Sequence, residues 1–266
     1  MRVFREENSV ISHENEAICR TLNVMVTILD DVELKRVEYP DVSGVVDRVI
    51  RPITPGGLHE FVGESVLSRF TRPGVKAIDL GTGYGAMAER LQNMGCEVLA
   101  ADLCSDGFEA KVSHIVINFN QPDFAARLGV NSFDIVTAIE VIEHVESPIG
   151  FLRNVRGLLA PAGVAVLTTP NVDCIPARIK YLLYGKIRCM DEQSEPTHIS
   201  PIFFDLFKRQ FLPASKLQLH QHLLFPPEGF QNCRRSVSLL MSLAARVFPG
   251  ESIIGDHHVF VLKALN

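Results

Sequence analysis

Two glutamates and a histidine follow one apolar run at a spacing that suits metal binding or acid–base chemistry. Glu140, Glu143 and His144 fall at i, i+3 and i+4, so a helix over this segment would place them on one face. His198 lies in a later polar stretch and could reach the same place. Two carboxylates and two imidazoles can hold Mg²⁺, Mn²⁺, Zn²⁺ or Fe²⁺, and the mixed set does not choose among these ions.

The same residues allow two other interpretations. Glu140 could orient a cofactor, Glu143 and His144 could cap the turn, and His144 or His198 could act as a general base without a metal. Alternatively, the segment is a hydrogen-bonded structural turn. The sequence leaves the three interpretations open, and Glu143, His144 and His198 are the candidate catalytic residues.

A glycine-rich loop separates an expected strand from an expected helix. Residues 77–85 read AIDLGTGYG, and such glycines let a backbone approach a ligand at the N-terminus of a helix. Asp102 ends the next expected strand, nineteen positions after Gly83, where a carboxylate can accept hydrogen bonds from ribose hydroxyls. Asp79 would repel a pyrophosphate but suits a cationic group, which favours S-adenosylmethionine over NAD.

Short apolar runs alternate with helical patterns between residues 75 and 170. Strands are expected at 75–80, 97–101, 114–117, 133–139 and 164–169. Met87, Leu91 and Met94 predict one helix, and Ser147-Pro148 predicts the start of another that ends near residues 160–163. This alternation predicts a parallel sheet with helices on both faces.

The flanking regions are less regular. Helices are expected at 58–70, 175–184, 200–210 and 234–248, and late strands at 217–225 and 257–264. The basic residues of 175–188 predict either a lid that faces an anionic substrate or a solvated helix face. His257 and His258 are neighbours in a strand and point to opposite faces, so a structural role is expected for them.

The glycine loop with Asp79 and Asp102 resembles the class I S-adenosylmethionine-dependent methyltransferases. The run EVIEHV at 140–145, Thr169-Pro170-Asn171 and His198 before Pro201 look like one subgroup of them. That subgroup contains ubiquinone-biosynthesis O-methyltransferases and is similar to small-RNA 2′-O-methyltransferases. The resemblance covers residues 75–170 well and 198–225 loosely. It implies an α/β, Rossmann-like, seven-stranded and mostly parallel sheet with a terminal antiparallel hairpin and helices on both faces.

The resemblance also implies site residues. S-adenosyl-L-methionine would be bound by Asp79, Gly81, Thr82, Gly83, Tyr84, Gly85, Asp102, Leu103, Asn118 and Glu140. Asn118 stands where many members have an aspartate against the adenine amino group, and its amide oxygen can also accept a hydrogen bond. In the small-RNA enzymes a similar set binds a divalent ion that grips the acceptor hydroxyls. Glu140, Glu143, His144 and His198 are therefore the expected metal ligands.

We therefore expect O-methylation of a hydroxyl on a small molecule or a glycan. The alternatives are methylation of an RNA ribose, an NAD-dependent oxidoreductase and a catalytically silent cofactor-binding partner. The net charge of −5 and the pI of about 6.0 argue against a nucleic-acid partner. We expect 1–70 to form a substrate lobe or lid, and 71–266 a methyltransferase domain with a lid insertion at about 172–200 and an excursion at about 226–256.

Compartment and membrane association are predicted from what the sequence lacks. The six cysteines form no C-x-x-C pair, which indicates buried thiols in a reducing compartment. No apolar run approaches the ~18 residues of a membrane span, and the first residues do not form a secretory signal. A cytoplasmic protein without a transmembrane segment is the resulting expectation.

Overall fold

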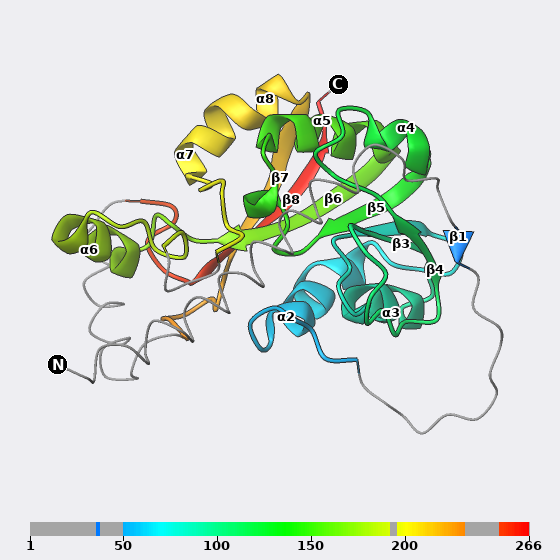
Figure 1. Ribbon diagram of the computed structural model, residues 1–266, viewed down its shortest axis with the longest axis horizontal. Helices are drawn as coiled ribbons and strands as arrows, with labels where there is room; N and C mark the ends of the chain where they lie inside the picture. Colours follow the sequence, from blue (N-terminus) through cyan, green and yellow to red (C-terminus); the bar gives the residue numbers. More distant parts are fainter. Residues whose placement is uncertain (1–35, 38–49, 192–195, 232–249, 266) are drawn as a thin grey trace, which may run out of the picture. The chain divides into compact units, whose positions relative to one another are not determined.

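The computed structural model in Figure 1 describes residues 36–37, 50–191, 196–231 and 250–265. The helix expected at 234–248 lies outside the described residues, as does most of the segment 1–70. The domain division at residue 70 therefore stays a prediction. None of the described helices is long and apolar enough to cross a membrane.

A mixed sheet forms the centre of the described fold. Its seven main strands are β2 (Lys76–Leu80), β3 (Glu97–Asp102), β4 (Ser113–Val116), β5 (Phe133–Ala138), β6 (Leu159–Pro170), β7 (Leu217–Phe225) and β8 (His257–Ala264). Their order is β4-β3-β2-β5-β6-β8-β7, and the two-residue β1 (Arg36–Val37) pairs antiparallel with β4. Strands β2 to β6 are parallel, whereas β8 runs antiparallel to β6 and β7. The predicted sheet with its terminal antiparallel hairpin is confirmed.

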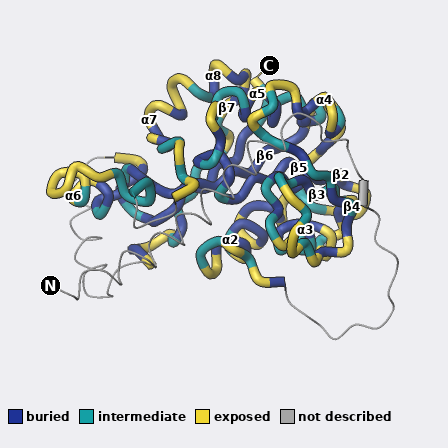
Figure 2. Tube along the Cα trace, in the orientation of Figure 1, coloured by how far each residue is buried: buried dark blue, intermediate teal, exposed yellow. Residues whose placement is uncertain are grey.

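Helices cover both faces of the sheet (Figure 1). On one face lie α2 (Leu58–Ser65), the 3₁₀ turn η1 (Leu67–Arg69) and α3 (Ala86–Asn93). On the other lie α4 (Phe124–Leu128), α5 (Pro148–Leu158), α7 (Phe204–Leu206), the π-helical η3 (Phe207–Phe211) and α8 (Leu212–Ala214). Helix α6 (Ile175–Tyr184) follows β6 at the carboxyl end of the sheet, and many of its side chains are exposed, as Figure 2 shows.

The two faces carry separate cores because successive strand residues point to opposite sides. Ile78 of β2 packs in the core that contains Phe151 of α5 and Phe260 of β8. Its neighbour Ala77 packs in the core that contains Met87 of α3. With both faces covered, the strands read as nearly continuous apolar runs, which is why the sequence predicts them well.

Three expected helices differ from the structure. The helix begun by Ser147, whose Oγ accepts from Gly150 N at 3.1 Å, ends at Leu158. Residues 160–163 belong instead to β6, because Leu159 already pairs with Phe133 of β5. The helix expected at 58–70 divides into α2 and η1, and the one expected at 200–210 begins at Phe204 and continues as η3 and α8 to Ala214.

The segment after β5 does not form the helix that would align the acidic residues with His144. It contains a single 3₁₀ turn, η2 (Ile142–His144). Glu140 precedes this turn with φ +55°, a left-handed conformation that interrupts helical geometry. Glu140, Glu143 and His144 therefore do not share one helical face, contrary to expectation.

Candidate functional site

The glycine loop joins β2 to α3 at the carboxyl end of the sheet. Gly81, Gly83 and Gly85 have φ values of 70°, 54° and 97°, which side chains rarely adopt. A Cβ at Gly81 would lie 2.4 Å from Val141 Cγ2, and one at Gly85 would lie 2.5 Å from Ala110 Cβ. The loop needs glycine at these two positions for both its backbone conformation and its packing.

Two carboxylates lie at this loop, and one of them, Asp102, bonds to its backbone. Asp102 Oδ2 accepts a hydrogen bond from Gly83 N at 2.7 Å, and Oδ1 accepts one from Leu103 N at 2.6 Å. Asp79 is buried and accepts a hydrogen bond from Thr137 Oγ1 at 2.7 Å. Burial raises the pKa of Asp79 from 3.8 to about 6, although the Thr137 hydroxyl opposes this rise. A cationic group beside Asp79 would stabilise its charged form.

A pocket of about 540 Å³ opens at the carboxyl ends of β2, β5, β6 and β3. One part of its wall is the glycine loop with the end of β2, including Asp79, Gly81, Thr82, Gly83 and Tyr84, together with Asp102. Another part contains His59, Glu140, His144, His198 and His257. The glycine loop and most of the chemical candidates therefore share one cavity, which is where α/β sheets of this kind bind ligands.

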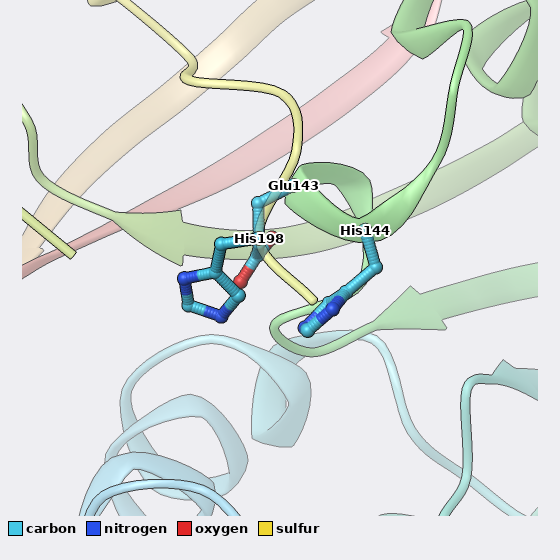
Figure 3. A group of neighbouring side chains, drawn as sticks. All are labelled: Glu143, His144 and His198. Carbon is cyan, nitrogen blue, oxygen red and sulfur yellow. The ribbon is translucent and has the colours of Figure 1, made fainter. Parts of the chain in front are cut away.

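Glu143, His144 and His198 form a cluster beside this pocket (Figure 3). One ligand atom from each residue can be chosen so that all lie within 4.8 Å of one another. The backbone fixes this meeting, because Glu143 O accepts from Ile199 N and Ser200 N, each at 2.9 Å. The two chain segments are thereby joined where their ligands meet.

The imidazoles of the cluster are oriented by groups behind them. His198 Nδ1 lies 2.7 Å from Cys189 O, a carbonyl that accepts but cannot donate, so Nδ1 carries the proton. His144 Nδ1 lies 2.9 Å from Thr197 Oγ1 and 3.2 Å from Thr197 O. With Nδ1 engaged, the lone pair on Nε2 of His198 is available to a cation, which is the usual arrangement of metal-binding histidines.

Glu143 is the most deeply buried member of the cluster. Its carboxylate is shielded from solvent, and neither oxygen makes a hydrogen bond of ordinary geometry with another described residue. Burial and the charge of Glu140 raise the pKa of Glu143 well above its usual value, and the nearby Thr169 hydroxyl lowers it only in part. A buried carboxylate without partners is costly, and a bound cation would offset that cost. The residues present therefore fit a divalent ion.

Glu140, the fourth expected metal ligand, is bound elsewhere. Its Oε1 accepts from Thr168 Oγ1 at 2.7 Å, and its backbone N donates to the same hydroxyl at 2.9 Å. Its Oε2 lies 2.9 Å from His257 Nδ1. The structure thus brings together three of the four residues and pairs the fourth with a histidine of β8.

His59 lines the pocket but had no signal in the sequence, and Arg188, one of the basic residues of 175–188, lines it as well. His59 of α2 is buried, and within the described part of the chain neither of its ring nitrogens has a hydrogen-bond partner. Arg188 follows α6 and pairs with buried Asp256 at 2.6 Å. By contrast, Asn118 does not line the pocket, and its Oδ1 accepts from Asn120 N at 2.9 Å. Its expected contact with adenine stays a prediction.

Sequence comparison identifies a family match over most of the described chain. Residues 47–212 match the family described as a methyltransferase domain. A ubiquinone biosynthesis O-methyltransferase of Caulobacter sp. (strain K31) is 32% identical over 127 residues, covering 42% of this chain and 50% of that protein. One from Roseobacter denitrificans is 34% identical over 104 residues, covering 37% of this chain and 42% of that protein. The chain thus spans about half the length of these curated relatives.

Solved structures share the fold at low sequence identity. A SAM-dependent methyltransferase from Archaeoglobus fulgidus has a TM-score of 0.51 at 16% identity, covering 77% of this chain and 94% of that one. Phosphoethanolamine N-methyltransferase 2 of Haemonchus contortus, solved with S-adenosyl-L-methionine, has a TM-score of 0.53 at 15% identity. That match covers 80% of this chain and 54% of the other. These likenesses concern the fold.

Proposed function

The chain belongs to the class I S-adenosylmethionine-dependent methyltransferases, and from this premise we propose that it methylates a hydroxyl oxygen of a small molecule. The meeting of Glu143, His144 and His198 beside the pocket of the glycine loop, which His144 and His198 line, carries this proposal. The names of the curated relatives, which are O-methyltransferases, support the same class of acceptor. A glycan hydroxyl is a second acceptor of the same chemistry.

The proposed roles follow from where each side chain lies. When bound, S-adenosylmethionine supplies a methyl group on a sulfonium, which the acceptor oxygen displaces directly. The glycine loop and Asp102 would hold its nucleoside end, and Asp79 its amino group. The pocket would align the acceptor and exclude water, which is the main requirement of a direct displacement.

Glu143, His144 and His198 would hold a divalent cation. Such an ion supplies Lewis acidity that lowers the pKa of a hydroxyl and can chelate two neighbouring ones. The three residues leave coordination positions open, as a catalytic metal site requires. Glu140 is not needed in this set, because its carboxylate is already bound by Thr168 and His257.

The experiment is methyl transfer from labelled S-adenosylmethionine to catechols, monophenols, sugars and a short RNA. The purified chain is first treated with a chelator, and Mg²⁺, Mn²⁺, Zn²⁺ or Fe²⁺ is then restored. We expect an O-methylated small molecule and a loss of roughly 10²-fold or more on chelation, since Lewis-acid stabilisation contributes several kcal/mol.

Variants distinguish the role of the metal from methyl transfer itself. Glu143→Gln and His198→Asn should lose the metal-dependent rate, and His220→Asn, which changes an exposed histidine of β7, should not. Full activity after chelation would refute the proposed role of the metal but not the proposed methyltransferase activity. Transfer to RNA alone, weakened by salt, would instead favour the ribose alternative. No transfer to any acceptor would favour a silent cofactor-binding partner.

A further inference from the structure

A buried glutamate–histidine pair in the pocket has no part in the metal cluster. Glu140 Oε2 and His257 Nδ1 lie 2.9 Å apart, and the two side chains are 11% and 7% exposed. The residues are 117 positions apart in the sequence, one after β5 and the other at the start of β8. Both line the pocket that contains the glycine loop. The pair therefore faces the place where cofactor and acceptor would meet.

The carboxylate fixes which nitrogen of His257 carries the proton. An ionised carboxylate only accepts hydrogen bonds, so His257 Nδ1 must donate to Glu140. In the neutral imidazole the lone pair is then on Nε2, which bonds to no described residue. A histidine held in this tautomer by a carboxylate is the arrangement of a general base.

Glu140 is held firmly enough to impose this orientation. Thr168 Oγ1 accepts from the backbone N of Glu140 and donates to its Oε1, so the residue is fixed at two points. Glu140 also has φ +55°, an unusual conformation for a glutamate. Strained residues of this kind persist where the surrounding structure holds them, and they cluster at active sites.

We propose that His257, oriented by Glu140, is the general base that removes the proton from the acceptor hydroxyl. The inference rests on the proposed function. In the reaction the O–H proton passes to His257 Nε2, and a lone pair of the acceptor oxygen forms the bond to the methyl carbon. The bond between that carbon and sulfur breaks, and its electron pair stays on sulfur. The proton then leaves from Nε2 to solvent.

The charges around His257 come from three segments. Glu140 faces it from the end of β5, Asp256 precedes it, and Arg188 approaches from the segment after α6. Burial lowers the pKa of His257, but the charge of Glu140 and the hydrogen bond to it outweigh burial, so the net pKa is raised. Removing the charge of Glu140 should therefore lower this pKa.

The test compares His257→Gln and Glu140→Gln with His220→Gln in the full chain. Glu140→Gln keeps an oxygen that can accept from Thr168 Oγ1 but presents its NH2 group to His257 Nδ1, which favours the opposite tautomer of His257. We expect both site variants to lose 10²- to 10⁴-fold in kcat for the methylated acceptor, the range for a general base. The Kd of His257→Gln for S-adenosylhomocysteine should change less than about threefold, and both site variants should unfold in one cooperative transition near the Tm of the parent, which shows that each has folded. His220→Gln should match the parent.

Nitrogen NMR of labelled histidines gives a readout that does not need an acceptor. The signals missing from the His257→Gln spectrum identify His257. In the parent they should show a protonated Nδ1 and a pKa above 6.5, and in Glu140→Gln a protonated Nε2 and a lower pKa. A parent His257 with its proton on Nε2, or a kcat of His257→Gln within threefold of the parent's, would overturn the role of His257 as general base. If the parent methylates no hydroxyl at all, the proposed function fails and the base role fails with it.

Discussion

Replacing Asp79 by asparagine should make the ligand-free protein more stable and its cofactor site weaker. Burial raises the pKa of Asp79 to about 6 in the folded chain from 3.8, so ionisation opposes folding above pH 3.8. This cost grows until the pH passes about 6 and then stays constant. The shift of about two pKa units corresponds to about 3 kcal/mol at pH 8 and about 1 kcal/mol at pH 4.5.

The assay is thermal and urea unfolding of the parent and Asp79→Asn at both pH values. Asparagine can still accept from Thr137, so the gain at pH 8 should approach about 3 kcal/mol, or roughly 6–12 °C in Tm. The Kd for S-adenosylhomocysteine should rise at least about tenfold. Asp106→Asn, at an exposed acid, is the matched control and should change neither quantity. Equal effects at the two pH values, or lower stability at pH 8, would refute the argument from burial.

Three further substitutions test other parts of the fold. Gly85→Ala puts a side chain on a residue with φ +97° and presses it against a neighbouring alanine, so the affinity for S-adenosylhomocysteine, measured by calorimetry, should fall. The control Gly56→Ala adds its methyl group in open space and should change this affinity little. Ser147→Ala removes the cap of α5 and should cost about 1 kcal/mol in urea unfolding, and unchanged stability would disprove the cap. Asp256→Ala leaves the largely buried guanidinium of Arg188 without its charge partner and should lower stability by about 3–5 kcal/mol. A loss below about 1 kcal/mol in the same assay would mean that the pair is solvated.

The sheet and the glycine loop could be predicted from sequence because their signals are local. Both faces of β2 and β6 are covered, so the strands read as apolar runs, and the limits of β7 and β8 agree with the prediction. The loop between β2 and α3 is marked by residue type, since its glycines occupy conformations that other residues avoid.

The arrangement of the acidic residues could not be predicted in the same way. Helical spacing suggested that Glu140 would join Glu143 and His144, but a left-handed conformation at a glutamate has no mark in the sequence. The partner of Glu140 is His257, which comes from a strand far along the chain. A pattern of neighbours cannot show which distant imidazole completes a buried pair. His59 was missed because it too reaches the pocket from a segment far from the other candidates in the sequence.

The first two residues of β8 place two histidines in different surroundings. His257 lies on the pocket side with Glu140, whereas His258 is buried among Phe204 and Phe260 and bonds to His222 at 3.0 Å. Substitutions of His257 should reduce turnover with little change in protein abundance in cells. Substitutions of His258 should reduce abundance and leave the turnover of each folded molecule unchanged. Selection can therefore act on chemistry and on folding at two adjacent codons almost independently.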